Sequence, residues 1–144
     1  MSGKILLALD LGDPDSIDRI LPVAEDMAAQ MGAELHVLSV VPAYSMPIVG
    51  AFFPEGFEKK AIAAARAALS DQLAAHARFP AAIKGHIAHG SIYEEIIRAA
   101  DTLDVDLIML ESHRPALKDY LLGPNAARVV RHARQSVYVH RSRD

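Results

Sequence analysis

The chain alternates between short, almost uninterrupted apolar runs and longer segments in which apolar residues recur every three or four positions. The short runs have the length of β-strands, and the longer segments have the period of amphipathic helices. Runs without polar alternation suit parallel strands that are buried on both faces. The alternation therefore predicts an α/β fold, with an open, five-stranded, mostly parallel sheet, right-handed crossovers and helices on both faces.

The expected elements follow one another in strict strand and helix order. Pro22 lies beyond the first turn of the first expected helix, so we expect a kink or a later helix start there. Ser91, with Glu94 three residues later, has the pattern of a capping box at the start of the third helix. We expect strands at residues 4–10, 34–41, 82–89, 106–111 and 136–140, and helices at 15 or 16–31, 57–78, 91–103 and about 125–132.

Residues 42–56 break this alternation. They contain three prolines and two glycines, which exclude regular structure, yet they also carry aromatic and aliphatic side chains. A long apolar loop of this kind is typical of a lid, a binding loop or a surface for a protein partner, and partial disorder is the alternative.

Composition narrows the class of protein. A length of 144 residues with 51% hydrophobic residues fits a single globular domain over residues 1–144. The absence of cysteine excludes disulfide scaffolds, thiol catalysis and cysteine-ligated metals. The apolar run near the start is too short for a signal peptide or a membrane span, so we expect a cytoplasmic protein without a membrane partner.

Charge is distributed unevenly along the chain. Residues 1–110 carry eight Lys or Arg against fifteen Asp or Glu, whereas residues 111–144 carry seven against three. The whole chain has a net charge of -3, which argues against extended binding to nucleic acid. A small anion is the better expectation for the basic final quarter.

Chemistry is expected where the strands of an open α/β sheet end at their carboxyl edge. The richest candidate segment is Glu111-Ser112-His113-Arg114, which precedes Gly123-Pro124-Asn125 at an expected helix start. A glycine-containing turn at a helix N-terminus offers backbone N–H groups and a positive dipole to phosphate. An ordinary helix cap is an equally good interpretation of this segment taken alone.

Several motifs together resemble the universal stress protein family over essentially the whole chain. The Ser-His-Arg-Pro segment, followed by Tyr-Leu-Leu-Gly and Asn-Ala-Ala, resembles small single-domain bacterial members. The resemblance implies an adenine-nucleotide alpha-hydrolase-like (Rossmann-like) fold. The motifs that carry it are Asp10 at the end of the first strand, Ser39-Val40-Val41-Pro42, His89-Gly90-Ser91, Ser112-His113, Leu121-Leu122-Gly123, Val129-Val130-Arg131-His132-Ala133 and Val137-Tyr138-Val139.

The resemblance also implies an ATP site, with magnesium as a possible companion. Asp10 would contact the ribose or a metal, Val40 would lie against adenine, and the main chain near Leu110 would pair with the edge of the base. The phosphate-binding positions by the same comparison are Glu111, Ser112, His113, Arg114, Gly123, Pro124, Asn125 and Ala126. Without the resemblance, Asp10 reads as a turn-initiating acid and Val40 as core.

The phosphate motif of that family is altered here. The motif consists of a glycine, two residues, a second glycine, nine residues, a third glycine and then serine or threonine. Glu111 stands at the first glycine, Arg114 at the second with a spacing one residue shorter, and Pro124 at the Ser or Thr. A carboxylate that points into the cleft would repel phosphate, and proline removes a backbone donor. Arg114 and the N–H groups of Asn125 and Ala126 could offset part of the loss.

Two main functions therefore remain open, beside a weaker third, an enzyme that hydrolyses nucleotide slowly, for which no catalytic base is identifiable. The first is a non-enzymatic, dimeric stress-response protein that binds ATP or a related adenine nucleotide weakly. The second is a protein-interaction module with a degenerate nucleotide site. The dimer would form through the edge strand at residues 136–140, by the strand pattern and by the resemblance.

No catalytic or metal site is expected. Ser112 beside His113 lacks the glycines of a nucleophile elbow, and no lysine motif of a phosphate-binding loop occurs. His86 and His89 point to opposite faces of one strand, so they cannot share a metal ion.

Overall fold

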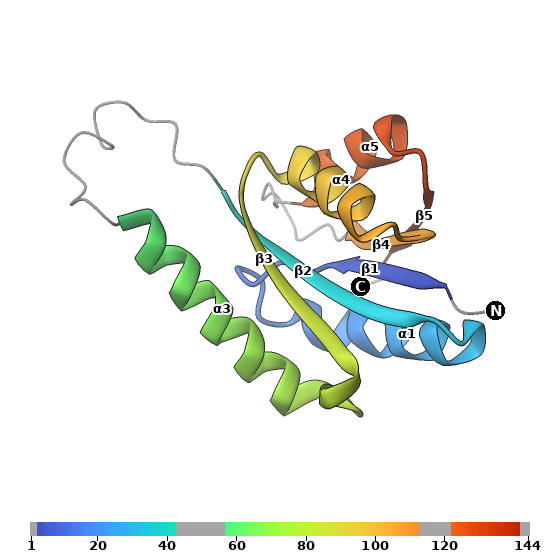
Figure 1. Ribbon diagram of the computed structural model, residues 1–144, viewed down its shortest axis with the longest axis horizontal. Helices are drawn as coiled ribbons and strands as arrows, with labels where there is room; N and C mark the ends of the chain where they lie inside the picture. The colour runs from blue at the N-terminus through green and yellow to red at the C-terminus, as the bar shows by residue number, and fades with distance from the viewer. Residues whose placement is uncertain (1–2, 43–56, 113–121, 142–144) are drawn as a thin grey trace.

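The computed structural model describes residues 3–42, 57–112 and 122–141 (Figure 1). The expected apolar loop therefore lies mostly outside the described residues. None of the described helices combines the length and the apolar character that crossing a membrane requires. The elements in chain order are β1 (Lys4–Ala8), α1 (Ser16–Met31), β2 (Glu34–Pro42), α3 (Phe57–His76), a 3-10 turn (Pro80–Ala82), β3 (Ile83–Gly90), α4 (Ile92–Leu103), β4 (Leu107–Ser112), α5 (Leu122–His132) and β5 (Ser136–Arg141).

The five strands form one sheet in the order β3-β2-β1-β4-β5, and all four strand pairs are parallel. This confirms the expected α/β class. The chain moves outward from β1 to β3 and then crosses back to place β4 on the other side of β1 (Figure 1). The strand order thus reverses between β1 and β4, and the carboxyl edge at this switch point is where such sheets bind ligands.

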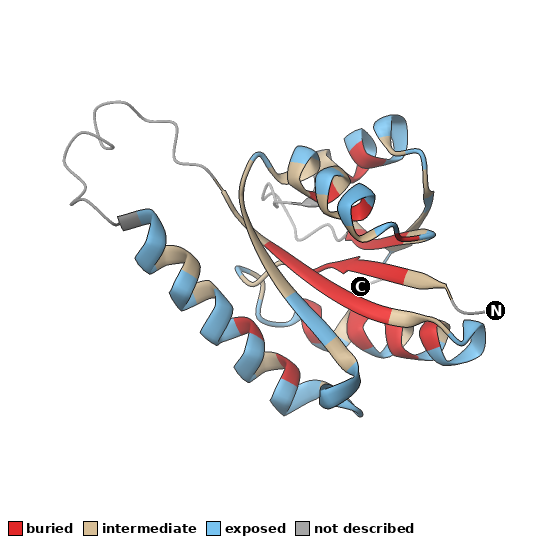
Figure 2. Cartoon of the chain, in the orientation of Figure 1, coloured by how far each residue is buried: buried red, intermediate tan, exposed pale blue. Residues whose placement is uncertain are grey.

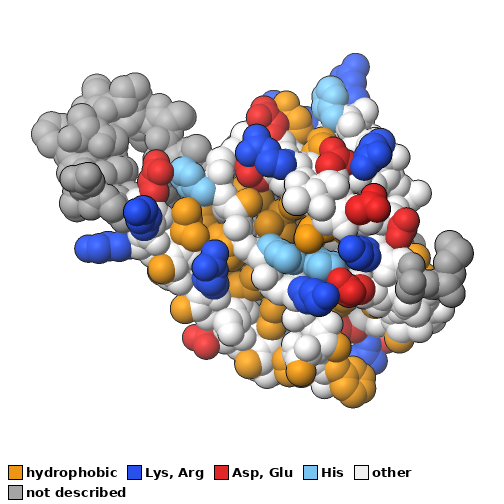
Figure 3. Space-filling view, in the orientation of Figure 1, with side chains coloured by type: hydrophobic (Ala, Val, Ile, Leu, Met, Phe, Trp, Pro, Cys, Tyr) orange, Lys and Arg blue, Asp and Glu red, His pale blue; other side chains and the backbone are white. Residues whose placement is uncertain are grey.

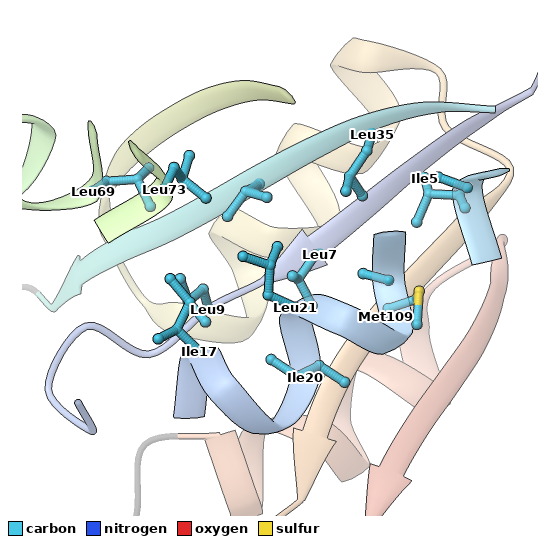
Figure 4. Packing of buried hydrophobic residues seen from close by; sticks show 13 residues of the cluster. Ile5, Leu7, Leu9, Ile17, Ile20, Leu21, Leu35, Leu69, Leu73 and Met109 are labelled. Atoms are coloured by element: carbon cyan, nitrogen blue, oxygen red, sulfur yellow. The ribbon is translucent and has the colours of Figure 1, made fainter. Parts of the chain in front are cut away.

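Each face of the sheet has its own core. On one face, Leu7 and Met109 from the central strands pack against α1 and α3, and Figure 4 shows Ile20 and Leu21 of α1 in the same cluster. On the other face, Leu6 and its neighbours pack against α4 and α5. Figure 2 shows that burial concentrates in β1, β2 and β4, as the apolar runs in the sequence predict for central strands.

The expected element ends are correct to within two residues, with one exception. Helix α5 begins at Leu122 rather than near Asn125, so Pro124 lies in its first turn, where a helix has no use for a backbone N–H. Helix α1 begins at Ser16 and continues through Pro22, so the later start was wrong. The capping box was also wrong, because Ser91 is the N-cap residue of α4 but its side chain makes no capping hydrogen bond.

Candidate functional site

The loop between β1 and α1 forms one wall of the switch point and is held by its own hydrogen bonds. The Gly12 backbone N–H donates to Asp10 Oδ1 at 2.8 Å, which fixes an Asx turn directly after β1. The Ser16 hydroxyl donates to the carbonyl oxygens of Asp10 (3.0 Å) and Asp13 (2.8 Å). These contacts keep Asp10 at the carboxyl edge of the sheet, beside the end of β4.

A hollow opens beside Asp10 on the face that α4 covers. It is a shallow depression with a cavity volume of about 10 Å³, it is open to solvent, and its walls are apolar except for Asp10. Val40, near the end of β2, lines the same hollow, so the structure brings together two residues that the family resemblance selects. The remaining lining residues are Ala8, Leu9, Leu38, Ile92 and Ile96.

Burial at this edge raises the pKa of Asp10 above its ordinary value. The hydrogen bond from Gly12 acts in the opposite direction, and the charges of Asp13 and Glu111 add to the rise. A carboxylate that is held charged in a partly apolar hollow lowers the stability of the fold. Such a residue is a candidate for binding rather than for structure.

We expect the Asp10→Asn variant to have a higher free energy of unfolding than the wild type at neutral pH. The folded-state pKa of Asp10 is raised, so the folded state loses stability as the pH rises from the unfolded value through the folded value. Asparagine keeps the Oδ1 acceptor for Gly12 and carries no charge. Urea unfolding at neutral pH and below the ordinary pKa of Asp checks this, since the advantage should vanish in acid; an equal advantage at both pH values would contradict it.

Glu111, the last residue but one of β4, points to the opposite face, toward α1. Its carboxylate is only 4% exposed and accepts two hydrogen bonds from Arg19, from Nε at 2.7 Å and from Nη2 at 3.0 Å. Arg19 Nη2 also donates to Asp13 Oδ2 at 2.5 Å. The bidentate contact with Glu111 holds the pKa of Arg19 above its ordinary value.

Arg19 changes how Glu111 is interpreted. The repulsion of phosphate expected from the sequence depends on a carboxylate that points into the cleft, but the Glu111 charge is turned toward α1 and compensated by a guanidinium. At the position of the first glycine in the family's phosphate motif, this protein therefore has the Arg19–Glu111 ion pair. The pair joins the β1–α1 loop to the end of β4. Sequence reasoning missed Arg19, although an acid that ends a buried strand needs a partner, and Arg19 is the first basic residue of the adjoining helix.

The other predicted site residues fall into three groups. Leu110 and Ala126 are buried in the core between the sheet and the helices α4 and α5, so only their main chains are available to a ligand. Ser112 closes β4 and is half-buried, and Asn125 Oδ1 accepts a hydrogen bond from the Tyr93 N–H at 3.2 Å. His113 and Arg114 lie outside the described residues, while Gly123 and Pro124 lie in the first turn of α5.

Three comparisons with known proteins agree with this architecture. A model of the universal stress protein family matches residues 1–141. Universal stress protein G of Salmonella typhimurium is 30% identical over 143 residues, which cover 98% of this chain and all of that protein. Universal stress protein UspA from Lactobacillus plantarum superposes with a TM-score of 0.71 at 26% identity, covering 95% of this chain and 96% of that one. A universal stress protein in complex with cAMP matches at a TM-score of 0.60 and 22% identity, with 96% of each chain covered.

Proposed function

The chain belongs to the universal stress protein family, and from this premise we propose that it binds an adenine nucleotide, ATP or a close relative, at the β1–β4 switch point. The nucleotide acts as a ligand of a cytoplasmic stress-response protein rather than as a substrate. The observation that carries this proposal is the hollow shared by Asp10 and Val40. A structural relative that forms a complex with cAMP supports the same ligand class.

The lining of the hollow has the chemistry that a base and a sugar require. Its apolar walls, including Val40 and Ile92, match a flat aromatic base, and Asp10 at the rim is an acceptor for ribose hydroxyls. Its cavity volume is about 10 Å³, far below the usual 300–1,000 Å³ of pockets that enclose a whole small molecule. The side chains that line the hollow would therefore have to move apart to admit the base, while the phosphates stay at the sheet edge, which favours weak binding.

The phosphates would lie near the first turn of α5 and the end of β4. A helix N-terminus attracts anions, and the α5 N-terminus adjoins the edge that Ser112 closes. Magnesium, when bound with ATP, would neutralise phosphate charge, and Asp10 is the carboxylate placed to approach it. Asp13 and Glu111 are both engaged by Arg19, so neither is placed as a catalytic base, which supports a binding role without catalysis.

Calorimetric titration with ATP and with cAMP, each with and without magnesium, tests this function. We expect saturable binding, and we expect the Val40→Arg variant to abolish it, because a charged side chain would fill the hollow and face its apolar walls. Val130→Arg is the matched control, since Val130 lies exposed on α5 away from the hollow and should leave binding unchanged. Binding that survives Val40→Arg would show that the hollow is not the site.

The second candidate is a protein-interaction module without a working nucleotide site. The altered glycine positions favour it, because the Arg19–Glu111 pair stands where the family's motif has its first glycine. If neither nucleotide binds while circular dichroism shows that the fold is intact, the protein-interaction module becomes the favoured function.

We further propose that the protein is a homodimer paired through β5. This strand is an edge of the sheet, and its outer backbone groups face away from β4, as in strands that pair with a second copy. We expect sedimentation at micromolar concentration to show a dimer and Val139→Asp to give a monomer. Ile87→Asp, an equally half-buried aliphatic position on the other edge strand, should stay dimeric. A monomeric wild type, or a dimeric Val139→Asp variant, would contradict the proposal.

A further inference from the structure

Two histidines meet on the α4 face of the sheet, outside the nucleotide site. His36 of β2 and His86 of β3 lie two register positions apart, and His36 Nδ1 is 2.8 Å from His86 Nε2. Their ring planes are only 19° apart, and their centroids are separated by 5.0 Å. Because the two nitrogens approach far more closely than the centroids, the rings meet edge to edge, with one nitrogen of each aimed at the other.

His36 is held in the orientation of a metal ligand. Its other nitrogen, Nε2, lies 2.7 Å from Glu34 Oε1, and because a carboxylate only accepts, this nitrogen carries the proton. The lone pair of Nδ1 then points at His86. Metal-binding histidines usually donate their second ring N–H to a carboxylate in this way. His36 is 3% exposed, so packing also fixes the ring.

The surroundings are polar and reachable from solvent. Lys84 Nζ lies 3.0 Å from the same Glu34 oxygen and is exposed. Figure 3 shows histidine, basic and acidic side chains gathered over β2 and β3 on this face. His86 is half-buried on an edge strand, so an ion can reach the contact from its side.

We propose that His36 Nδ1 and His86 Nε2 bind a divalent transition-metal ion of the zinc class, with Glu34 orienting His36. Zinc–nitrogen bonds of about 2.0–2.1 Å at a tetrahedral angle place two ligand nitrogens about 3.4 Å apart. The nitrogens need to separate by about 0.6 Å from their present contact, and the rings need to turn so that the two nitrogens, now aimed at each other, both face the ion; the edge-strand side chain of His86 can supply this movement. The proton on His86 Nε2 moves to its Nδ1 through solvent, so the neutral pair needs no net proton release.

Within residues 3–42, 57–112 and 122–141, no group of three or more His, Asp or Glu side chains is arranged to hold a metal. The site therefore offers two protein ligands, and water completes the coordination. Imidazole nitrogen favours zinc, copper and nickel over magnesium or calcium. The ligand class is thus distinct from the magnesium that would accompany ATP.

Zinc titration of the chelator-treated full chain by calorimetry tests the proposal, together with NMR of the histidine ring nitrogens. We expect one zinc ion per chain at this contact and zinc-induced shifts of the ring nitrogens of His36 and His86. His86→Gln should weaken binding at least tenfold, and Glu34→Gln should weaken it by about 10- to 100-fold, because the charged partner of His36 is lost.

His89→Gln is the matched control, since His89 lies on the same strand but points to the opposite face. Its affinity for zinc should equal that of the wild type. His36 is buried, so the His36→Gln variant can fail to fold. In that case His86→Gln decides the question, because His86 is only half-buried. No binding at millimolar zinc, or an equal loss in His86→Gln and His89→Gln, would overturn the proposal and leave a hydrogen-bonded pair with a shared proton.

Discussion

Replacing Arg19 with methionine is expected to lower the free energy of unfolding by about 3–5 kcal/mol. The variant leaves the Glu111 carboxylate, 4% exposed, without the two hydrogen bonds that compensate its burial. Removing one partner of a buried pair costs far more than the pair contributes, because the remaining charge stays desolvated. Urea unfolding followed by circular dichroism measures the loss.

Two further variants test whether the loss of stability comes from the buried charge of Glu111. Arg98→Met removes an i,i+3 pair with Glu95 on the surface of α4, where the arginine side chain is 70% exposed, and should cost no more than about 0.5 kcal/mol. The double variant Arg19→Met with Glu111→Leu should recover most of the lost stability, because no charge is left buried. A loss below about 1 kcal/mol in Arg19→Met would show that Glu111 finds water or another partner.

Of these variants, Arg19→Met should also change nucleotide affinity, and by the largest factor that we expect for this site. Once freed from Arg19, the Glu111 carboxylate could turn from α1 toward the proposed phosphate path. At about 4 Å from a phosphate charge it would be repelled by about 4 kcal/mol at an effective dielectric constant near 20, a factor of about 1,000 in affinity. In the wild type Arg19 holds the Glu111 carboxylate toward α1 and pairs its charge, which would remove most of this repulsion. We therefore expect Arg19→Met to weaken ATP binding by at least tenfold, with about 1,000-fold as the upper limit.

A double-mutant cycle separates this effect from the loss of stability. Glu111→Leu alone should bind ATP at least as well as the wild type, and the double variant should return to within about threefold of it. Calorimetry at a temperature where every variant is folded gives the four affinities. If Arg19→Met and the double variant are weakened equally, Arg19 contacts the phosphate itself, and the charge of Glu111 has no influence on binding.

The fold could be predicted from the sequence because its determinants are local. The central strands are apolar runs such as Ile5–Leu9. Parallel strands that are buried on both faces lack alternating polar residues, so they are easily recognised in the sequence. Helix α1 ends at Gly32, whose φ of 62° is the left-handed conformation that glycine favours. The start of α5 could not be predicted in this way, because Pro124 is compatible both with a segment before a helix and with its first turn.

The polar contacts could not be predicted, because their partners lie far apart in the sequence. Arg19 and Glu111 are separated by 92 residues, and His36 and His86 by 50. Periodicity assigns a residue to a face of its own strand, which was enough to separate His86 from His89. It cannot assign the neighbour on the next strand, since that depends on register.

The strand order also affects how the chain is made. Strand β1 pairs with β2 on one side, but its other neighbour, β4, arrives about 100 residues later, as the register Ile5↔Leu107 shows. At about 5–20 residues per second of synthesis, one edge of β1 stays unpaired for about 5–20 s. Strand β1 is apolar from Ile5 to Ala8, so the nascent chain is a candidate for chaperone binding at this unpaired edge until β4 leaves the ribosome.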